Sequence, residues 1–139
     1  MITVNASEVR RNWGGFIDDT VRIKPQFVTR SRDTVVALSI STFREILSTY
    51  TFTATLFKED DGSITAALNQ IDIFENGKDE KDVLNRLASA LHEYAMDYYL
   101  EFNLWSTAKN RKAHLPFVLN VLAQQNLEEV RRLINAKME

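Results

Sequence analysis

The pattern of apolar and polar residues predicts a short strand followed by a helix at the start of the chain. Residues 1–5 alternate and are β-branched, which is typical of a strand. Asn5 and Glu8 have the spacing of a capping box, in which each side chain binds a backbone amide at the start of a helix. Apolar side chains then recur at helical intervals from Val9 to Ile17, so we expect one helix over this stretch.

The next elements are predicted to be a hairpin and a second helix. Residues 26–30 and 34–40 are rich in β-branched side chains, and three polar residues separate them, which favours a tight turn. Thr42 and Glu45 repeat the capping-box spacing ahead of further apolar residues. Residues 1–50 therefore predict the element order β-α-β-β-α.

A small antiparallel sheet is predicted next. Alternation indicates three strands, at 52–57, 64–68 and 71–74. Residues 58–62 end in the Asp-Gly pair that hairpin turns favour, and Asn76-Gly77 marks a further turn. The three strands therefore predict a three-stranded antiparallel sheet.

The rest of the chain predicts helices. Asp79 is a favourable N-cap, and leucines and tyrosines recur every three or four positions from 80 to about 102, which predicts one long helix. Pro116 suits the first turn of a short helix. Asn126 is expected to cap a last helix in which Ile134 faces inward.

We place the domain boundary in residues 48–51, between a domain at 1–50 and a domain at 51–139. The predicted fold class is α+β, with an N-terminal β-α-β-β-α module followed by a small three-stranded antiparallel sheet plus C-terminal helices. This order places every strand before the long helix.

The composition excludes several classes of protein. The chain has 139 residues, of which 45% are hydrophobic and 26% are charged, as in an ordinary globular protein. No apolar run approaches the ~20 residues that a membrane helix needs. The first residues lack the basic and apolar segments of a secretory signal, so we expect a cytoplasmic protein without membrane contact. The absence of cysteine excludes disulfides, cysteine metal sites and thiol nucleophiles.

The charges are distributed unevenly between the two domains. Residues 1–50 carry seven Lys and Arg against five Asp and Glu, whereas residues 51–139 carry ten against fourteen. A basic module joined to an acidic one favours a polyanion-binding end and a separate partner-binding end. Ordinary solvated surfaces are the alternative interpretation.

No motif for enzymatic chemistry is present. The chain lacks the G-x-S-x-G and G-x-x-x-x-G-K-[ST] patterns of hydrolase nucleophiles and phosphate loops. His92 and His114 have no His or Cys at the spacing of a metal ligand, so we expect no catalytic residue, metal or cofactor.

One set of carboxylates keeps a nuclease in consideration, because metal-dependent phosphoryl chemistry needs several of them close together. Two of the set fall in the predicted hairpin loop, where Asp is favoured by the geometry of the turn itself. The set comprises Asp60, Asp61, Asp72 and Glu75.

The basic residues of the first domain are the better candidates for a binding site. The fork of an arginine binds guanine edges or phosphates, and asparagine binds adenine or phosphate. The DNA-binding candidates lie early in the first helix and around the hairpin: Arg10, Arg11, Asn12, Arg30 and Arg32. A solvated helix face is the alternative.

The first domain resembles the Phd/YefM family of bacterial type II antitoxins. The resemblance is carried by residues 7–13 (SEVRRNW), 28–30 (VTR) and 35–39 (VVALS), and by Phe43. It covers residues 1–48 and implies a homodimer, or a higher oligomer, that binds operator DNA and represses its own operon. It also implies DNA contacts from Arg10 and Arg30. Trp13 departs from the family's usual leucine, and Gly14-Gly15 departs from its good helix formers.

Residues 52–100 more faintly resemble the HicB-like antitoxin domain, which has a partial RNase H-like fold without nuclease activity. The resemblance rests on residues 58–63 (KEDDGS), on Asn76-Gly77 and on a helix from Glu80. It implies that the second half of the chain is folded, whereas Phd/YefM antitoxins usually end in a flexible segment that folds onto the toxin.

An acidic helix face is the candidate surface for that toxin. Glu93, Asp97 and Glu101 follow one another at i, i+4 spacing, and a toxin that cleaves RNA is often basic. A solvated acidic face is the alternative.

Three functions are compatible with the sequence. The first is an antitoxin that represses its operon and neutralises a toxin by binding it. The second is an interaction protein whose first domain only dimerises, and the third is a metal-dependent nuclease. Operator binding with a steep salt dependence separates the first from the second, and cleavage that requires a divalent metal marks the third.

Overall fold

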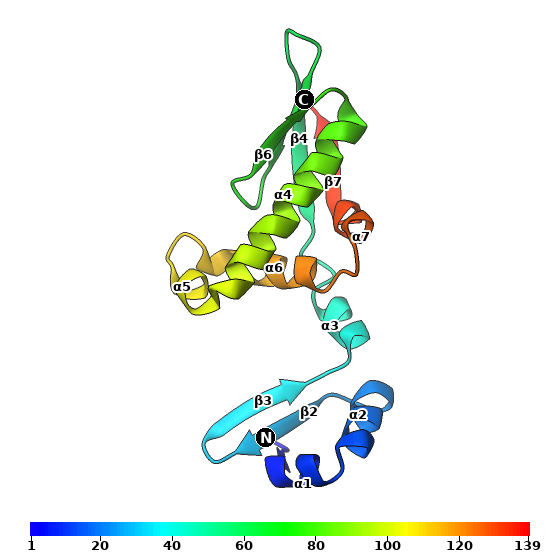
Figure 1. Ribbon diagram of the computed structural model, residues 1–139, viewed down its shortest axis with the longest axis vertical. Helices are drawn as coiled ribbons and strands as arrows, with labels where there is room; N and C mark the ends of the chain where they lie inside the picture. Colours follow the sequence, from blue (N-terminus) through cyan, green and yellow to red (C-terminus); the bar gives the residue numbers. More distant parts are fainter. The chain divides into compact units, whose positions relative to one another are not determined.

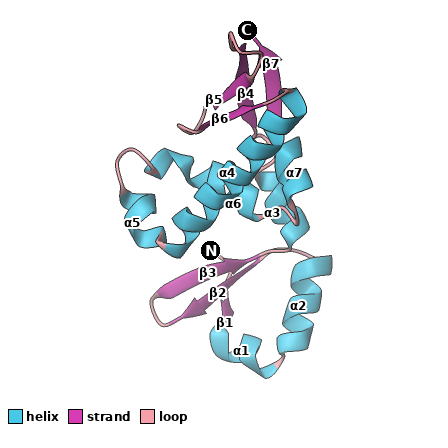
Figure 2. Ribbon diagram, turned by 45° about the horizontal axis from the view of Figure 1, so that its top comes forward, coloured by secondary structure: helices cyan, strands magenta, loops and turns pink.

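The computed structural model describes all 139 residues and divides into two compact units, Met1–Ile46 and Leu47–Glu139. Each unit combines helices with a sheet, so the predicted α+β class is confirmed (Figures 1 and 2).

The first unit contains a three-stranded sheet in the order β1-β2-β3. Strand β1 runs parallel to β2 with Val4 opposite Val28, and β2 pairs antiparallel with β3. The elements of this unit are β1 (Val4–Asn5), α1 (Ala6–Arg11), α2 (Trp13–Arg22), β2 (Gln26–Arg30), β3 (Asp33–Ala37) and α3 (Ile40–Ile46).

The first helix is interrupted, so the prediction of one continuous helix was wrong. Helix α1 ends at Arg11, and Asn12 takes a non-helical backbone conformation. The side-chain oxygen of Asn12 accepts a hydrogen bond from the Gly15 amide at 3.3 Å and thereby starts α2. The missing Cβ of Gly15 makes room for this contact, since a Cβ there would collide with the Asn12 side chain. Asn12 is thus a second N-cap inside the expected helix.

Three local details of the first unit also differ from expectation. The Asn5 oxygen accepts from the Ser7 amide at 2.9 Å, so the predicted capping box with Glu8 does not form. The hairpin loop contains only two residues, because β3 already begins at Asp33. Ser39, rather than Thr42, provides the side-chain oxygen at the start of α3, where it accepts from the Thr42 amide at 3.1 Å.

The second unit contains a four-stranded sheet in the order β6-β5-β4-β7. Long helix α4 packs against β5 and β6 and also against α6 and α7. The elements of this unit are β4 (Phe52–Lys58), β5 (Ile64–Leu68), β6 (Phe74–Gly77), α4 (Glu80–Leu100), α5 (Phe102–Thr107), the 3-10 turn η1 (Lys112–His114), α6 (Leu115–Leu122), α7 (Leu127–Arg132) and β7 (Ile134–Met138).

The structure corrects the predicted sheet in two places. The third strand covers Phe74–Gly77 instead of 71–74, so Asn76-Gly77 lies within β6 and not in a turn. Ile134 opens β7, a fourth strand parallel to β4, rather than continuing the last helix. A parallel partner leaves no local signal, because its pairing residues lie far away in the sequence. Helix α4 was predicted with a cap at Asp79, and the Asp79 carboxylate accepts from the Asp82 amide at 2.8 Å.

The two units differ sharply in how much apolar surface they bury. In the second unit, a single core joins the sheet to α4, α6 and α7, and Phe52, Leu87, Leu91 and Tyr98 are fully buried. In the first unit only Phe16 and Thr20 are buried. The first unit therefore has little core of its own.

Candidate functional site

Two of the predicted arginines lie together in the first unit. Arg10, near the end of α1, and Arg30, at the end of β2, line the same depression of about 420 Å³. The start of α1 and the turn after β2 complete its wall with Asn5, Ser7 and Ser31. Because β1 pairs with β2 and α1 follows β1 directly, the sheet brings this helix beside the hairpin.

Both guanidinium groups are exposed and available to a ligand. Arg10 has no acidic partner, and Arg30 lies 4.0 Å from the Asp33 carboxylate in a pair that is about four-fifths exposed on each side. An exposed pair of this kind contributes little stability, so an incoming anion can replace Asp33 at low cost.

The other three predicted DNA contacts are placed differently. Arg11 binds the Glu8 carboxylate at 2.7 Å, and the Asn12 side-chain oxygen caps α2. Arg32 is exposed at the hairpin turn and does not line the depression shared by Arg10 and Arg30. The structure therefore groups Arg10 with Arg30 and leaves Arg11, Asn12 and Arg32 around them.

A row of apolar side chains on α2 is exposed in the first unit. Trp13, Ile17 and Val21 follow at i, i+4 spacing, and Trp13 is 60% exposed. Trp13 stacks on Phe16, with 5.6 Å between the ring centroids. This row is therefore exposed on a unit that buries only two residues.

The predicted acidic surface is exposed and ends at a bend. Glu93 and Asp97 lie on α4, whereas Glu101 lies between α4 and α5. The helix predicted to run to about residue 102 ends at Leu100, because the Glu101 carbonyl accepts from the Leu104 and Trp105 amides at 3.1 Å and starts a new helix.

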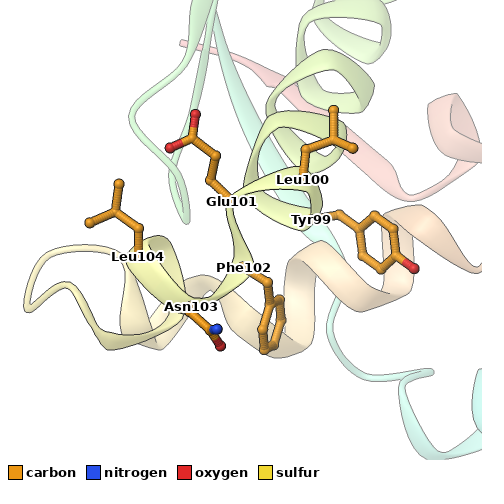
Figure 3. Close-up of a pocket in the computed structure, with 6 residues that line it drawn as sticks. All are labelled: Tyr99, Leu100, Glu101, Phe102, Asn103 and Leu104. Carbon is orange, nitrogen blue, oxygen red and sulfur yellow. The ribbon is translucent and has the colours of Figure 1, made fainter.

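The bend also has an apolar part that the sequence did not predict. Figure 3 shows Leu100, Glu101 and Leu104 pointing to one side of the bend, and Phe102 to the other. The segment from Tyr99 to Leu104 lines a depression of about 440 Å³, and Leu100 is 72% exposed. Leu100 was expected inside the long helix and Leu104 beyond its end, and the break at Glu101 gave no sequence signal.

The carboxylates considered for a nuclease do not come together. Asp60 and Asp61 lie in the hairpin loop, where the Asp61 carboxylate accepts from the hydroxyl and the amide of Ser63 at 2.6 and 2.9 Å. These bonds, chiefly the one from the hydroxyl, lower the pKa of Asp61. No group of three His, Asp or Glu side chains in the structure is arranged to hold a metal ion.

None of the helices combines the length and the apolar character that a membrane span requires. The longest helix, α4, carries charged residues along its length.

Comparison with known proteins gives two matches that extend over the chain. A family model described as PHD-like, the antitoxin of RelE/RelB toxin–antitoxin systems, matches residues 1–136. A crystal structure from Syntrophomonas wolfei subsp. wolfei, described as an antitoxin part of a candidate toxin/antitoxin system, is 40% identical and covers all of both chains with a TM-score of 0.92. No curated protein matches the chain.

Proposed function

We propose, since this chain belongs to the PHD-like family of antitoxins of RelE/RelB toxin–antitoxin systems, that it acts in the cytoplasm as a homodimeric repressor and a toxin inhibitor. In this proposal the first unit binds operator DNA and represses the operon. The second unit binds the cognate toxin.

The arrangement of Arg10 and Arg30 carries the DNA-binding part of the proposal. Two exposed guanidinium groups from separate elements line one depression, and neither forms a strong ion pair. Guanidinium forks bind phosphate oxygens and guanine edges with two parallel hydrogen bonds. Arg32, exposed at the hairpin turn, adds a further positive charge, whereas Arg11 is paired with Glu8.

The incomplete core of the first unit supports the homodimer. A unit of this size that buries only Phe16 and Thr20 needs further apolar contacts to be stable. The exposed row Trp13, Ile17 and Val21 offers such contacts to a second copy. A dimer also presents two copies of the arginine pair, as operator half-sites require.

The bend after α4 supports the toxin-binding part. Glu93, Asp97 and Glu101 are exposed beside the apolar side chains Leu100 and Leu104. Apolar residues surrounded by charges are typical of protein interfaces, and an acidic surface accelerates encounter with a basic RNA-cleaving enzyme.

DNA binding by the full chain tests the first part directly. The probe is the duplex upstream of the protein's own reading frame, and Arg10→Ala and Arg30→Ala are compared with the wild type. Each substitution is expected to cost about 1–3 kcal/mol of binding free energy where the arginine contacts a base, or a sequence-independent loss where it contacts phosphate.

Arg86→Ala is the matched control, because Arg86 is exposed on α4 and binds Asp82 within the second unit. It should leave DNA affinity unchanged. Full affinity of both Arg10→Ala and Arg30→Ala at moderate salt would contradict the assignment, and so would binding that does not weaken with salt.

A further inference from the structure

A cluster of aromatic and basic side chains in the second unit holds one arginine in a fixed position. The guanidinium carbon of Arg111 lies 4.4 Å from the ring centroid of Trp105 and 5.5 Å from that of Tyr94. One of its nitrogens donates to the Tyr94 hydroxyl at 3.2 Å. The Tyr98 hydroxyl donates to the Arg111 carbonyl at 3.0 Å, so the backbone is fixed as well.

This arginine has no carboxylate partner. None of the ion pairs within 4 Å in the structure involves Arg111, although it is only partly exposed. A guanidinium carries five N–H donors, and only the one to Tyr94 is used. A partly desolvated cation with unused donors is energetically favourable only when an anion or water fills its remaining positions.

His114 lies beside the same tyrosine hydroxyl. The Tyr94 hydroxyl, which accepts from Arg111, also forms a hydrogen bond of 2.6 Å with the Nδ1 atom of His114. Burial, and to a lesser degree the Arg111 charge, lower the pKa of His114.

These groups surround a cavity. A pocket of about 480 Å³ is lined by Tyr94, Trp105, Asn110, Arg111 and His114, together with Ile71 and Asp72. The walls are partly aromatic and partly polar, which is the usual character of a small-ligand site. This pocket shares no lining residue with the depression at the acidic bend.

The charge of the lining residues selects the kind of anion. Arg111 is positive and Asp72 is negative, and no oxygen of Asp72 comes within 4 Å of the guanidinium. A phosphate dianion would be repelled by Asp72, whereas a carboxylate carries one charge and fits the two-pronged geometry of a guanidinium.

We propose that this pocket binds a carboxylate group, with Arg111 as its ion-pair partner and His114 or Asn110 as additional donors. The carboxylate belongs either to a small organic acid or to an acidic side chain of a protein partner. Both sources present a carboxylate to Arg111, and a comparison of acetate with a Glu-containing peptide separates them.

Fluorescence of Trp105 in the full chain measures this binding. Trp13→Phe leaves Trp105 as the single tryptophan, and sodium acetate is titrated against sodium chloride at equal ionic strength. We expect a saturable change with acetate and none with chloride. Inorganic phosphate at pH 8, where the dianion predominates, should bind at least tenfold more weakly than acetate at the same pH.

Two variants test the assignment of the groups. Arg111→Gln should abolish the acetate response, and Lys109→Gln is the matched control because Lys109 is in the same loop but does not line the pocket. Asp72→Asn should tighten acetate binding and raise the affinity for phosphate. Since Asp72 is exposed, this second variant keeps the test decisive if Arg111→Gln disturbs the fold.

A peptide arm distinguishes the two sources. The blocked tripeptide acetyl-Gly-Glu-Gly-amide carries its only carboxylate on a side chain, and the Gln analogue carries none. Tighter binding of the Glu peptide than of acetate supports a protein partner, and the reverse supports a small acid. The proposal is overturned if neither probe binds, if phosphate binds best, if the Gln peptide binds as well as the Glu peptide, or if Lys109→Gln abolishes binding.

Discussion

Ile134 of β7 lies directly opposite Phe52 of β4 in a parallel strand pair, and both side chains are buried, at 3% and 0% exposure. The Phe52 amide donates to the Leu133 carbonyl at 2.8 Å at the start of this pairing. The last strand of the chain therefore completes the sheet beside the first strand of the second unit.

This pairing predicts a large loss of stability for Ile134→Ala. Removal of a buried isoleucine side chain leaves a cavity in the core and costs about 2–5 kcal/mol. Met138→Ala in the same strand is the control, because Met138 is half exposed and should cost about 0.5 kcal/mol or less. Urea unfolding of both variants measures the difference, and equal midpoints would contradict the burial of β7.

Gly77 and Gly14 are expected to respond to alanine in opposite directions. A Cβ on Gly77 would lie 2.6 Å from the Val83 amide nitrogen in the first turn of α4, so Gly77→Ala should destabilise by about 1–3 kcal/mol. A Cβ on Gly14 meets nothing within 4 Å, and alanine in exposed helix α2 should stabilise by about 0.5–1 kcal/mol. Thermal unfolding measures both effects, and a neutral Gly77→Ala would contradict the close approach of β6 to α4.

The sequence predicted the elements whose signals are local. Asp79 and Asn126 were expected to cap helices, and each side chain accepts the expected amide, from Asp82 at 2.8 Å and from Glu129 at 2.9 Å. The leucine and tyrosine spacing of α4 likewise matches its buried face. In these places the residues that determine the structure lie within a few positions of one another.

Elements that depend on distant contacts were missed. Strand β7 pairs with β4, so nothing near Ile134 distinguishes it from a helix. The Arg111 pocket gathers groups from α4, α5 and the loop before α6, and their convergence depends on how these elements pack. Arg10 and Arg30 were identified from charge and from the family resemblance, and only the structure brings them to one depression.

The exposed row on α2 predicts a dimer that single substitutions weaken. The full-length wild type should sediment as a dimer, and Ile17→Asp should shift it toward monomer because a buried charge at an interface has no partner there. Leu127→Asp is the matched control, since Leu127 is about equally exposed in the second unit. A monomeric wild type, or dimer loss only in Leu127→Asp, would place the interface elsewhere.

The acidic surface predicts charge-dependent toxin binding. Asp97→Lys should reduce co-purification with the product of the adjacent reading frame and slow association more than it speeds dissociation. Glu59→Lys introduces the same change in the exposed hairpin loop and should have no effect. Unchanged binding for Asp97→Lys at low salt would remove α4 from the interface.

The environment of His114 predicts a pH dependence of stability. Burial, followed by the Arg111 charge, lowers the pKa of His114 below its ordinary 6.5, so the folded protein resists protonation in a range where the unfolded chain binds a proton. The unfolded state then carries more protons than the native state, and the free energy of unfolding must rise with pH across this range. The contribution of His114 to the free energy of unfolding is complete above pH 6.5 and is lost as the pH falls through the folded-state pKa.

NMR titration of the His114 ring should place its pKa below 6.5, and Arg111→Gln should raise this pKa because the positive neighbour is gone. Urea unfolding of His114→Gln should show a weaker pH dependence between these two pKa values than the wild type. A His114 pKa at or above 6.5, or the same pH dependence in wild type and His114→Gln, would contradict the half-buried environment of His114 beside Arg111.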